Sequence, residues 1–461
     1  MASLIWWQFK YSWRKWLGTL FVFVTGGVIA GFTLIGISST ISAHLDTGEF
    51  NPIPFFAIPT VFGAITLVLI VNGVTRLLVN SFSQEYALWA MLGANINQLS
   101  ALISGQMTLI SLIGASLGYF LSYPIVISIY GWIRTTPGMT QLPQVPLALS
   151  FVSFAGTIIA IGCISALMTF VDARRIFSNK QKKIRRFRGI RKYGTKLLII
   201  LICVGGFLGL AYLYSLFFKR PAEVLALFSS KNTSLPNAYT NIFLGIVFIA
   251  MILFSLMAPL LLPLMVKMLS KILPHERLKT FETAYWSVLD KRDFLKSVVV
   301  PLVIFSILSS YFTYMALDLA NVAAKRSLME IVGTITIFLG APFLIIFANM
   351  ISITIISSTQ RNAGVYQLQL LGFAWLDFVS EKVVEAFLYA GVVFLAGLVN
   401  NIFLYGAVLR AAEQTNVVVN DSWLSIAYWP FASCLLAFLF VLLIDLIYTY
   451  RISIVGDQQK Q

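Results

Sequence analysis

The chain has 461 residues, of which 59% are hydrophobic and only 11% charged, and its formal net charge is +15. A soluble protein would carry roughly 25% charged residues, and a disordered one would expose far less apolar surface, so both classes are excluded. What remains is a polytopic membrane protein, in which each span needs roughly 20 apolar residues.

Ten apolar runs are long enough to cross a membrane. A segment rich in Trp and basic residues, 6–16, precedes the first run and is typical of a helix at the membrane interface. The sequence therefore predicts an all-α fold of about ten transmembrane helices. In chain order the runs are Leu17–Ser42, Ile53–Val79, Leu99–Ile133, Leu147–Val171, Leu197–Phe218, Asn241–Leu269, Val298–Leu317, Gly333–Ser357, Val379–Tyr405 and Leu424–Tyr448.

Basic residues are concentrated in two loops. Eleven Lys and Arg lie between positions 172 and 196 and seven between 267 and 296, whereas the loop 43–52 has none. The positive-inside rule then places both loops and both termini in the cytoplasm. The positive charge is thus mainly a topology signal, with anionic lipid or an acidic partner surface as a second interpretation, and nucleic acid is not implied.

Motifs for catalysis, metal binding and nucleotide binding are missing from the sequence. Cys163, Cys203 and Cys434 lie inside apolar runs and are expected to be buried, and His44 and His275 are too few and too far apart for a zinc motif. There is no GxxxxGK[ST] loop to bind ATP. The chain is therefore not expected to be an enzyme or to hold a cofactor or metal itself.

Two parts of the chain follow the same plan, in which a span, a short amphipathic piece ending in Leu-Gly and a long span succeed one another. The first short piece covers residues 83–94 and the second 360–373. Such a piece is either a simple interfacial connector or a rigid helix that docks a soluble partner. The duplication favours docking.

Helix signals support both pieces. In the first, Tyr86, Trp89 and Leu92 form an apolar stripe, Glu85 lies near the start, where the helix dipole favours an anion, and Gly93 supplies the stop. The second piece has Tyr366 and Leu370 four residues apart and Gly372 as the stop.

Residues 83–94 resemble the signature of FtsX/MacB-type (type VII) ABC transporter permeases, in which a segment E-x-x-L-x-x-x-G-A follows the second span. The matching residues are Glu85, Leu88, Leu92, Gly93 and Ala94. Residues 166–176 resemble the end of the same family domain. The second piece departs from the pattern, with Gly364 in place of the acidic residue and Phe373 in place of the alanine.

The order of spans resembles the BceB-type branch of this family, which has two four-span units joined by two extra spans. The resemblance implies a first FtsX-like unit at 1–196, two linking spans at 197–275 and a second FtsX-like unit at 276–461, which starts with an amphipathic elbow helix at 277–296. A large extracellular domain follows the seventh span in BceB-type permeases. Here only the short loop 318–332 stands at that place.

This resemblance implies a permease subunit in a bacterial cell membrane. A separate dimer of ATPase subunits, which binds ATP and Mg, would push on the short helices, and the spans would transmit that motion to export or extract an amphiphile such as a peptide, an antimicrobial or a lipid-like molecule (mechanotransmission). The expected ATPase contacts are Glu85, Tyr86, Leu88, Trp89, Leu92, Gly93, Tyr366, Leu370, Leu371 and Gly372.

Two other functions remain open. A signalling transducer that moves no cargo would work with an accessory sensor or a sensor kinase, in antimicrobial-peptide sensing or cell-wall control. An ion-coupled carrier or intramembrane enzyme would need midplane carboxylates or a catalytic constellation, and no convincing set is present in the sequence.

Polar residues inside spans are the default candidates for a substrate path. Asn72, Asn349 and Glu385 are the candidates here. Glu385 ends a stripe formed with Asp377 and Glu381, and like charges at this spacing repel unless they are solvated or paired. We expect most of the stripe to be a solvated helix end, with Glu385 alone buried.

Overall fold

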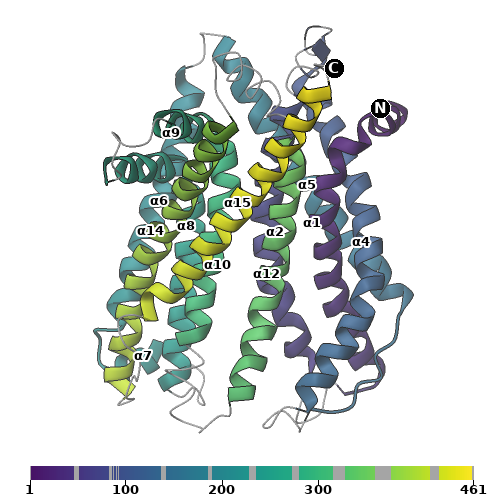
Figure 1. Cartoon of the computed structure of the whole chain (residues 1–461). Coiled ribbons are helices and arrows are strands. Elements are labelled where there is room, and N and C mark those ends of the chain that lie inside the picture. Colours follow the sequence, from purple (N-terminus) through teal and green to yellow (C-terminus); the bar gives the residue numbers. More distant parts are fainter. Residues whose placement is uncertain are drawn as a thin grey trace. The chain divides into compact units, whose positions relative to one another are not determined.

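The computed structural model describes residues 2–45, 51–82, 86, 88–89, 91, 93–135, 142–184, 189–227, 235–272, 280–314, 328–358, 375–415 and 425–458. All regular elements in these residues are helices, which confirms the predicted all-α class (Figure 1). They are α1 (Ala2–Ser42), α2 (Ile53–Ser81), α4 (Ile96–Arg134), α5 (Phe151–Ile184), α6 (Gly189–Leu216), α7 (Pro221–Leu227), α8 (Leu235–Ile272), α9 (Phe281–Asp290), α10 (Arg292–Tyr314), α12 (Leu328–Ser358), α14 (Trp375–Thr415) and α15 (Ser425–Gln458).

Within the described ranges, nine of these helices are long and apolar enough to cross a membrane. They correspond to nine of the ten expected runs, and the second spans Ile53–Val79 in both cases. The remaining run, expected at Leu197–Phe218, contains the shorter apolar helix Ile200–Leu216 within α6. The chain is thus a multi-pass membrane protein.

The first of two compact units consists of Met1–Phe187 and Leu328–Ala374 and contains α1, α2, α4, α5 and α12. Glycines let α1 and α4 approach closely, since a Cβ added to Gly27 would lie 2.8 Å from the Cα atom of Ala115. The late helix α12 packs on α1 and α2, and the rings of Phe62 and Phe338 lie 6.0 Å apart. The first unit therefore includes a helix from far along the chain.

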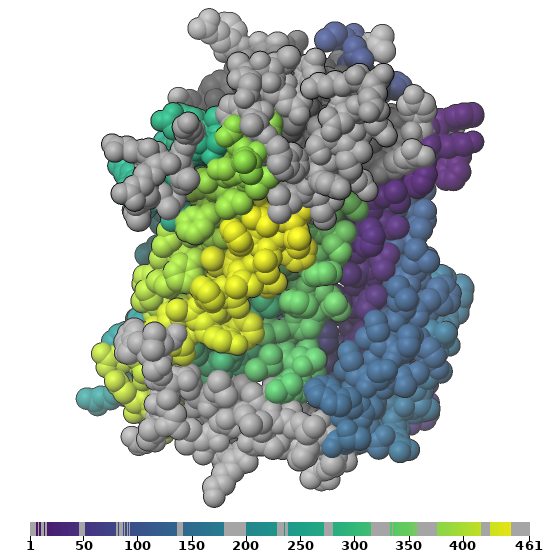
Figure 2. All heavy atoms as spheres, viewed as in Figure 1, coloured from purple at the N-terminus to yellow at the C-terminus, as the bar shows by residue number. Residues whose placement is uncertain are grey.

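The second unit consists of Arg188–Ser327 and Trp375–Gln461 and contains α6, α7, α8, α9, α10, α14 and α15. The apolar part of α10 is 94% buried, the largest share among the nine described spans, and α8, α14 and α15 pack around it. Figure 2 shows α14 and α15, in yellow-green and yellow, side by side at the surface. Helix α10 is thus the core of this unit.

The units group helices by packing, whereas the boundaries expected near residues 196 and 275 follow the order of the chain and stay a prediction. One expectation about side chains is wrong: Cys163 is exposed, and Cys203 and Cys434 are partly exposed. Cys163 thus lies on an outer face of α5, where an apolar thiol meets lipid in a membrane protein.

Candidate functional site

The first short helix connects α2 with α4, and we call residues 83–94 the coupling segment. The amide of Phe82 donates to the carbonyl oxygen of Leu78 and the amide of Tyr86 to that of Phe82, each at 3.0 Å. The helical hydrogen bonds of α2 therefore continue into the segment. A force on the segment would reach α2 through this continuous backbone.

Tyr86 anchors the coupling segment to the first unit. Its side chain is only 2% exposed, and its ring lies 5.8 Å from that of Phe82 and 5.6 Å from that of Phe177 on α5. Phe82 in turn stacks on Trp16 of α1 at 5.5 Å. Tyr86 thus belongs to the support beneath the segment, and its predicted contact with an ATPase stays a prediction.

The opposite side of the coupling segment is apolar and exposed. Leu88 is 61% exposed and Met91 82% exposed, and their i, i+3 spacing places both on one face of the helix. Trp89 is half-buried between the two sides. Met91 was missed in the sequence prediction, although its position three residues after Leu88 carried the signal.

A tight stop ends the coupling segment. Gly93 has a φ of +92°, and the amide of Ala94 donates to the carbonyl oxygen of Trp89 at 3.0 Å, the bond that closes a Schellman motif. A Cβ on Gly93 would meet nothing within 4 Å, so the backbone conformation, not space, requires glycine here.

Helix α4 begins directly after this stop. The amide of Asn95 donates to the side-chain oxygen of Gln98 at 3.0 Å, half of a capping box, and α4 starts at Ile96. Because no flexible linker lies between the segment and α4, a displacement of the segment has a direct route into this span.

Six of the predicted ATPase contacts lie outside the described residues, and their roles stay predictions. They are Glu85 and Leu92 in the coupling segment and Tyr366, Leu370, Leu371 and Gly372 in the second short piece.

Two of the three predicted substrate-path residues belong to the first unit. Asn72 on α2 is half-buried, and Asn349 on α12 is 2% exposed. Both lie about three turns beyond the contact between Phe62 and Phe338, so they stand at similar heights along two packed helices.

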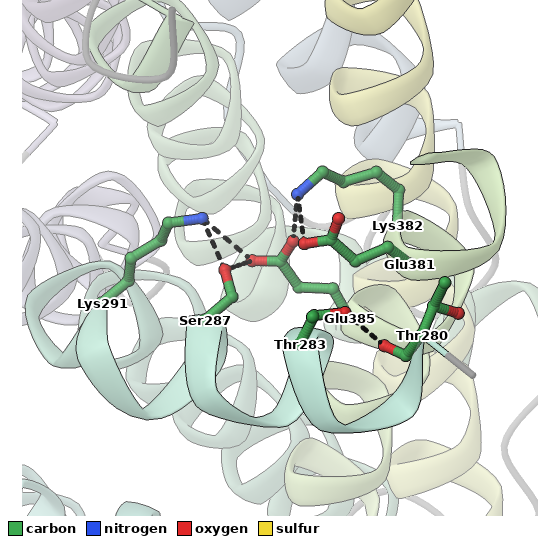
Figure 3. A network of polar contacts seen from close by, with 7 residues as sticks. All are labelled: Thr280, Thr283, Ser287, Lys291, Glu381, Lys382 and Glu385. Carbon is green, nitrogen blue, oxygen red and sulfur yellow. Dashed lines mark hydrogen bonds and ion pairs between the residues drawn. The ribbon is translucent and has the colours of Figure 1, made fainter. Parts of the chain in front are cut away.

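Glu385, the third residue, lies in the second unit inside a network of charges between α9 and α14 (Figure 3). Its carboxylate is fully buried, with Oε2 at 2.6 Å from the Nζ atom of Lys382 and Oε1 at 3.4 Å from that of Lys291. The hydroxyl of Ser287 also donates to Oε1, at 3.3 Å. These contacts engage both oxygens and favour a role in joining α9 to α14.

The expectation that most of the acidic stripe is solvated is wrong for Glu381, which is 3% exposed. Its Oε1 atom lies 3.6 Å from the Nζ atom of Lys382, while its Oε2 atom has no hydrogen-bond partner in the described part of the chain. Lys382 thus stands between two carboxylates. Together with Lys291 the network contains two positive and two negative groups, so its charges balance.

Among the described residues, no group of three or more His, Cys, Asp or Glu side chains is arranged to hold a metal ion.

The helices and their hydropathy define a polytopic membrane protein. Residues 56–180 match the family described as FtsX-like permease C-terminal, a range that includes most of α2, the coupling segment, α4 and most of α5. This matched range and the all-helical fold fit an FtsX/MacB-type permease. This family is a membrane permease component of ABC transporters. No curated protein matches the chain.

Proposed function

We propose that this permease couples ATP hydrolysis on a separate dimer of ATPase subunits to the export or extraction of an amphiphilic substrate. In this proposal the chain spans a bacterial cell membrane with both termini in the cytoplasm. One ATPase subunit docks on the coupling segment and the other on residues 360–373. ATP and Mg bind to the ATPase, and the spans carry the motion to the far side of the membrane.

The observation that supports this function best is the exposed apolar pair Leu88 and Met91 on an otherwise anchored segment. Exposed apolar side chains at a helix that lies outside the apolar spans are typical of an interaction surface. Tyr86 fixes the segment to α1 and α5, and the Gly93 stop fixes it to α4. A partner that presses on this pair therefore moves several spans at once.

Replacing Leu88 with Glu tests the docking surface. The variant puts a charge where an apolar partner surface is expected, so co-purification of the ATPase should fall at least about tenfold, and the ATP turnover of the reconstituted complex should fall with it. Asn97→Glu is the matched control. Asn97 is exposed at the start of α4, so this variant adds the same charge nearby. This control should retain the ATPase.

Equal recovery of the ATPase with Leu88→Glu and with Asn97→Glu would refute the docking surface. Transport by the intact complex in vesicles then tests the second half of the proposal, with labelled peptides and lipids as cargo. If these amphiphiles change ATP turnover but do not move across or out of the bilayer, the transport proposal is wrong. The complex would then be a signalling transducer.

A further inference from the structure

A group of hydroxyl and amide side chains lies in the core of the second unit, between α10, α14 and α15. We call it the hydroxyl cluster, and all five members are fully buried. It is far from the charges of the α9–α14 network, since no charged residue occurs in 297–314, 386–409 or 425–443. The members are Ser306, Ser309, Ser310, Asn401 and Ser433.

The contacts between helices place these side chains together. A Cβ on Gly397 of α14 would lie 3.1 Å from the Oγ atom of Ser306, and the rings of Tyr314 and Tyr405 lie 5.7 Å apart. Halfway between these two contacts, one helical turn from each, Ser310 on α10 is level with Asn401 on α14. The two helices run in the same direction here.

The third helix meets α10 in the opposite direction. The indole Nε1 of Trp429 on α15 donates to the hydroxyl of Thr313 at 2.7 Å. A Cβ on Gly397 would also lie 3.2 Å from Pro430, so Ser433 lies nearest the level of Ser306, about two turns from the level of Asn401 and Ser310. The cluster is therefore built from three helices and extends over about two helical turns.

The hydroxyls of this cluster are unusual because they lack the partner that a serine in a helix normally uses. Elsewhere on α10, Ser297 donates to the carbonyl oxygen of Asp293 and Thr313 to that of Ser309, both at 2.8 Å. Within the described part of the chain, no such partner exists for the hydroxyls of Ser306, Ser309, Ser310 and Ser433.

Asn401 has one engaged and one free end. Its Nδ2 atom donates at 2.9 Å to the carbonyl oxygen of Ile426, which lacks its helical donor because Pro430 has no N–H group. Its Oδ1 atom has no partner among the described residues. The cluster thus offers four hydroxyls and one amide oxygen, all uncharged, in a region where polar groups without partners are costly.

We propose that the hydroxyl cluster binds the uncharged, hydrogen-bonding head group of an amphiphile, such as a polyol or an amide. This inference rests on the proposed function, for which it names the substrate class. Hydroxyls and an amide oxygen can donate to and accept from such a head group, whereas nothing at this depth neutralises a phosphate or a carboxylate. Entry requires α15 to move from α10, and Pro430 interrupts the hydrogen bonding of α15 beside the cluster.

Photolabelling of the permease alone tests the site without any ATPase. The probe is a monoacylglycerol with a diazirine next to its head group, in phosphatidylcholine vesicles, and an alkyl phosphate with the same diazirine is the charged counterpart. The monoacylglycerol should label α10, α14 or α15, and unlabelled monoacylglycerol should compete. The alkyl phosphate should label these helices at least about tenfold less.

The variant Ser306→Ala/Ser309→Ala/Ser310→Ala keeps the small side chains that close packing needs and removes only the hydroxyls. We expect an unchanged or higher Tm and a loss of labelling of about tenfold or more, the effect of losing two neutral hydrogen bonds. Ser297→Ala, which removes a hydroxyl with a partner on the same helix, should label like the native chain. Ser433→Ala tests α15 separately, with a smaller loss.

Equal labelling of the native chain and the triple variant would overturn the site, because the serines would then serve packing alone. Equal labelling by the alkyl phosphate would overturn the substrate class. This test can fail or succeed independently of the proposed function. If labelling depends on the serines but Leu88→Glu does not lower the recovery of the ATPase, the docking proposal is wrong and the binding site stands.

Discussion

A buried carboxylate in a membrane protein is stable only where cations and hydrogen-bond donors surround it. Glu385 meets this condition through Lys382 on its own helix and Lys291 at the end of α9. Sequence reasoning predicted the burial of Glu385 but not that of Glu381. Glu381 and Glu385 share Lys382, and their charges balance only because Lys291, more than 90 positions earlier, supplies a second cation to Glu385, which no local pattern reveals.

Glu385→Gln is therefore expected to destabilise the second unit by about 3 kcal/mol, because it leaves two lysines facing a single carboxylate in a buried network. Thermal unfolding in detergent measures this effect. Glu413→Gln is the matched control: Arg410 and Glu413 form a 2.7 Å pair at the same i, i+3 spacing, but their side chains are 50% and 62% exposed. This control should cost less than about 0.5 kcal/mol, and equal losses for both variants would contradict the network's role.

For α9, the sequence pattern predicted the helix but not the direction in which each large side chain points. The run 277–296 predicted an amphipathic elbow helix, and the structure has α9 at Phe281–Asp290. Phe281 and Leu289 are buried as its apolar face requires, yet Trp286 is 64% exposed. Periodicity predicts that a helix has two faces, but which large side chain turns outward depends on the helix against which it packs.

That neighbour is α14, to which α9 is fixed at both ends. The hydroxyls of Thr280 and Ser380 lie 2.8 Å apart beside the start of α9, and Lys291 pairs with Glu385 at its other end. We expect α9 and α14 to move as one body. A Thr280→Cys/Ser380→Cys pair should therefore form a disulfide under mild oxidation, since the hydroxyl distance fits the reach of a cystine.

ATP turnover of the complex should be the same before and after this cross-link forms, and reduction should not change it. Trp286→Cys with Ser380→Cys is the control, because the exposed Trp286 side chain points away from the unit and should give little cross-link. Loss of turnover on oxidation of the first pair, restored by reduction, would mean that α9 and α14 must separate during the cycle.

At the scale of the whole molecule, the sequence predicted the spans well and their partners poorly. Nine of the predicted runs are apolar helices in the structure, because about 20 consecutive apolar residues are enough to identify a span. The grouping of α12 with α1 and α2 depends on contacts such as that between the backbone of Ser352 and Gly18, where a Cβ would lie 2.8 Å from the carbonyl oxygen. Such contacts join distant parts of the chain and leave no trace in hydropathy.

The number of membrane crossings determines whether the two termini lie on the same side of the membrane, and this number depends on whether α6 crosses. Its described apolar part, Ile200–Leu216, is shorter than the nine candidate spans, but the basic cluster before it is the strongest inside signal in the chain. If α6 crosses, ten spans place both termini on one side. If it does not, nine spans place them on opposite sides.

Cysteines at the exposed positions Arg175 and Arg220, which flank α6, separate these cases in a chain whose three native cysteines are replaced by alanine. We expect a membrane-impermeant maleimide added to intact cells to label Arg220→Cys and not Arg175→Cys. Asn51→Cys and Asn97→Cys, which flank the long span in α2, calibrate the assay and should behave as the outside and inside standards. If Arg175→Cys and Arg220→Cys instead react alike, α6 does not cross, and the second short piece 360–373 would lie on the side opposite to the coupling segment, where one cytoplasmic ATPase dimer could not reach both.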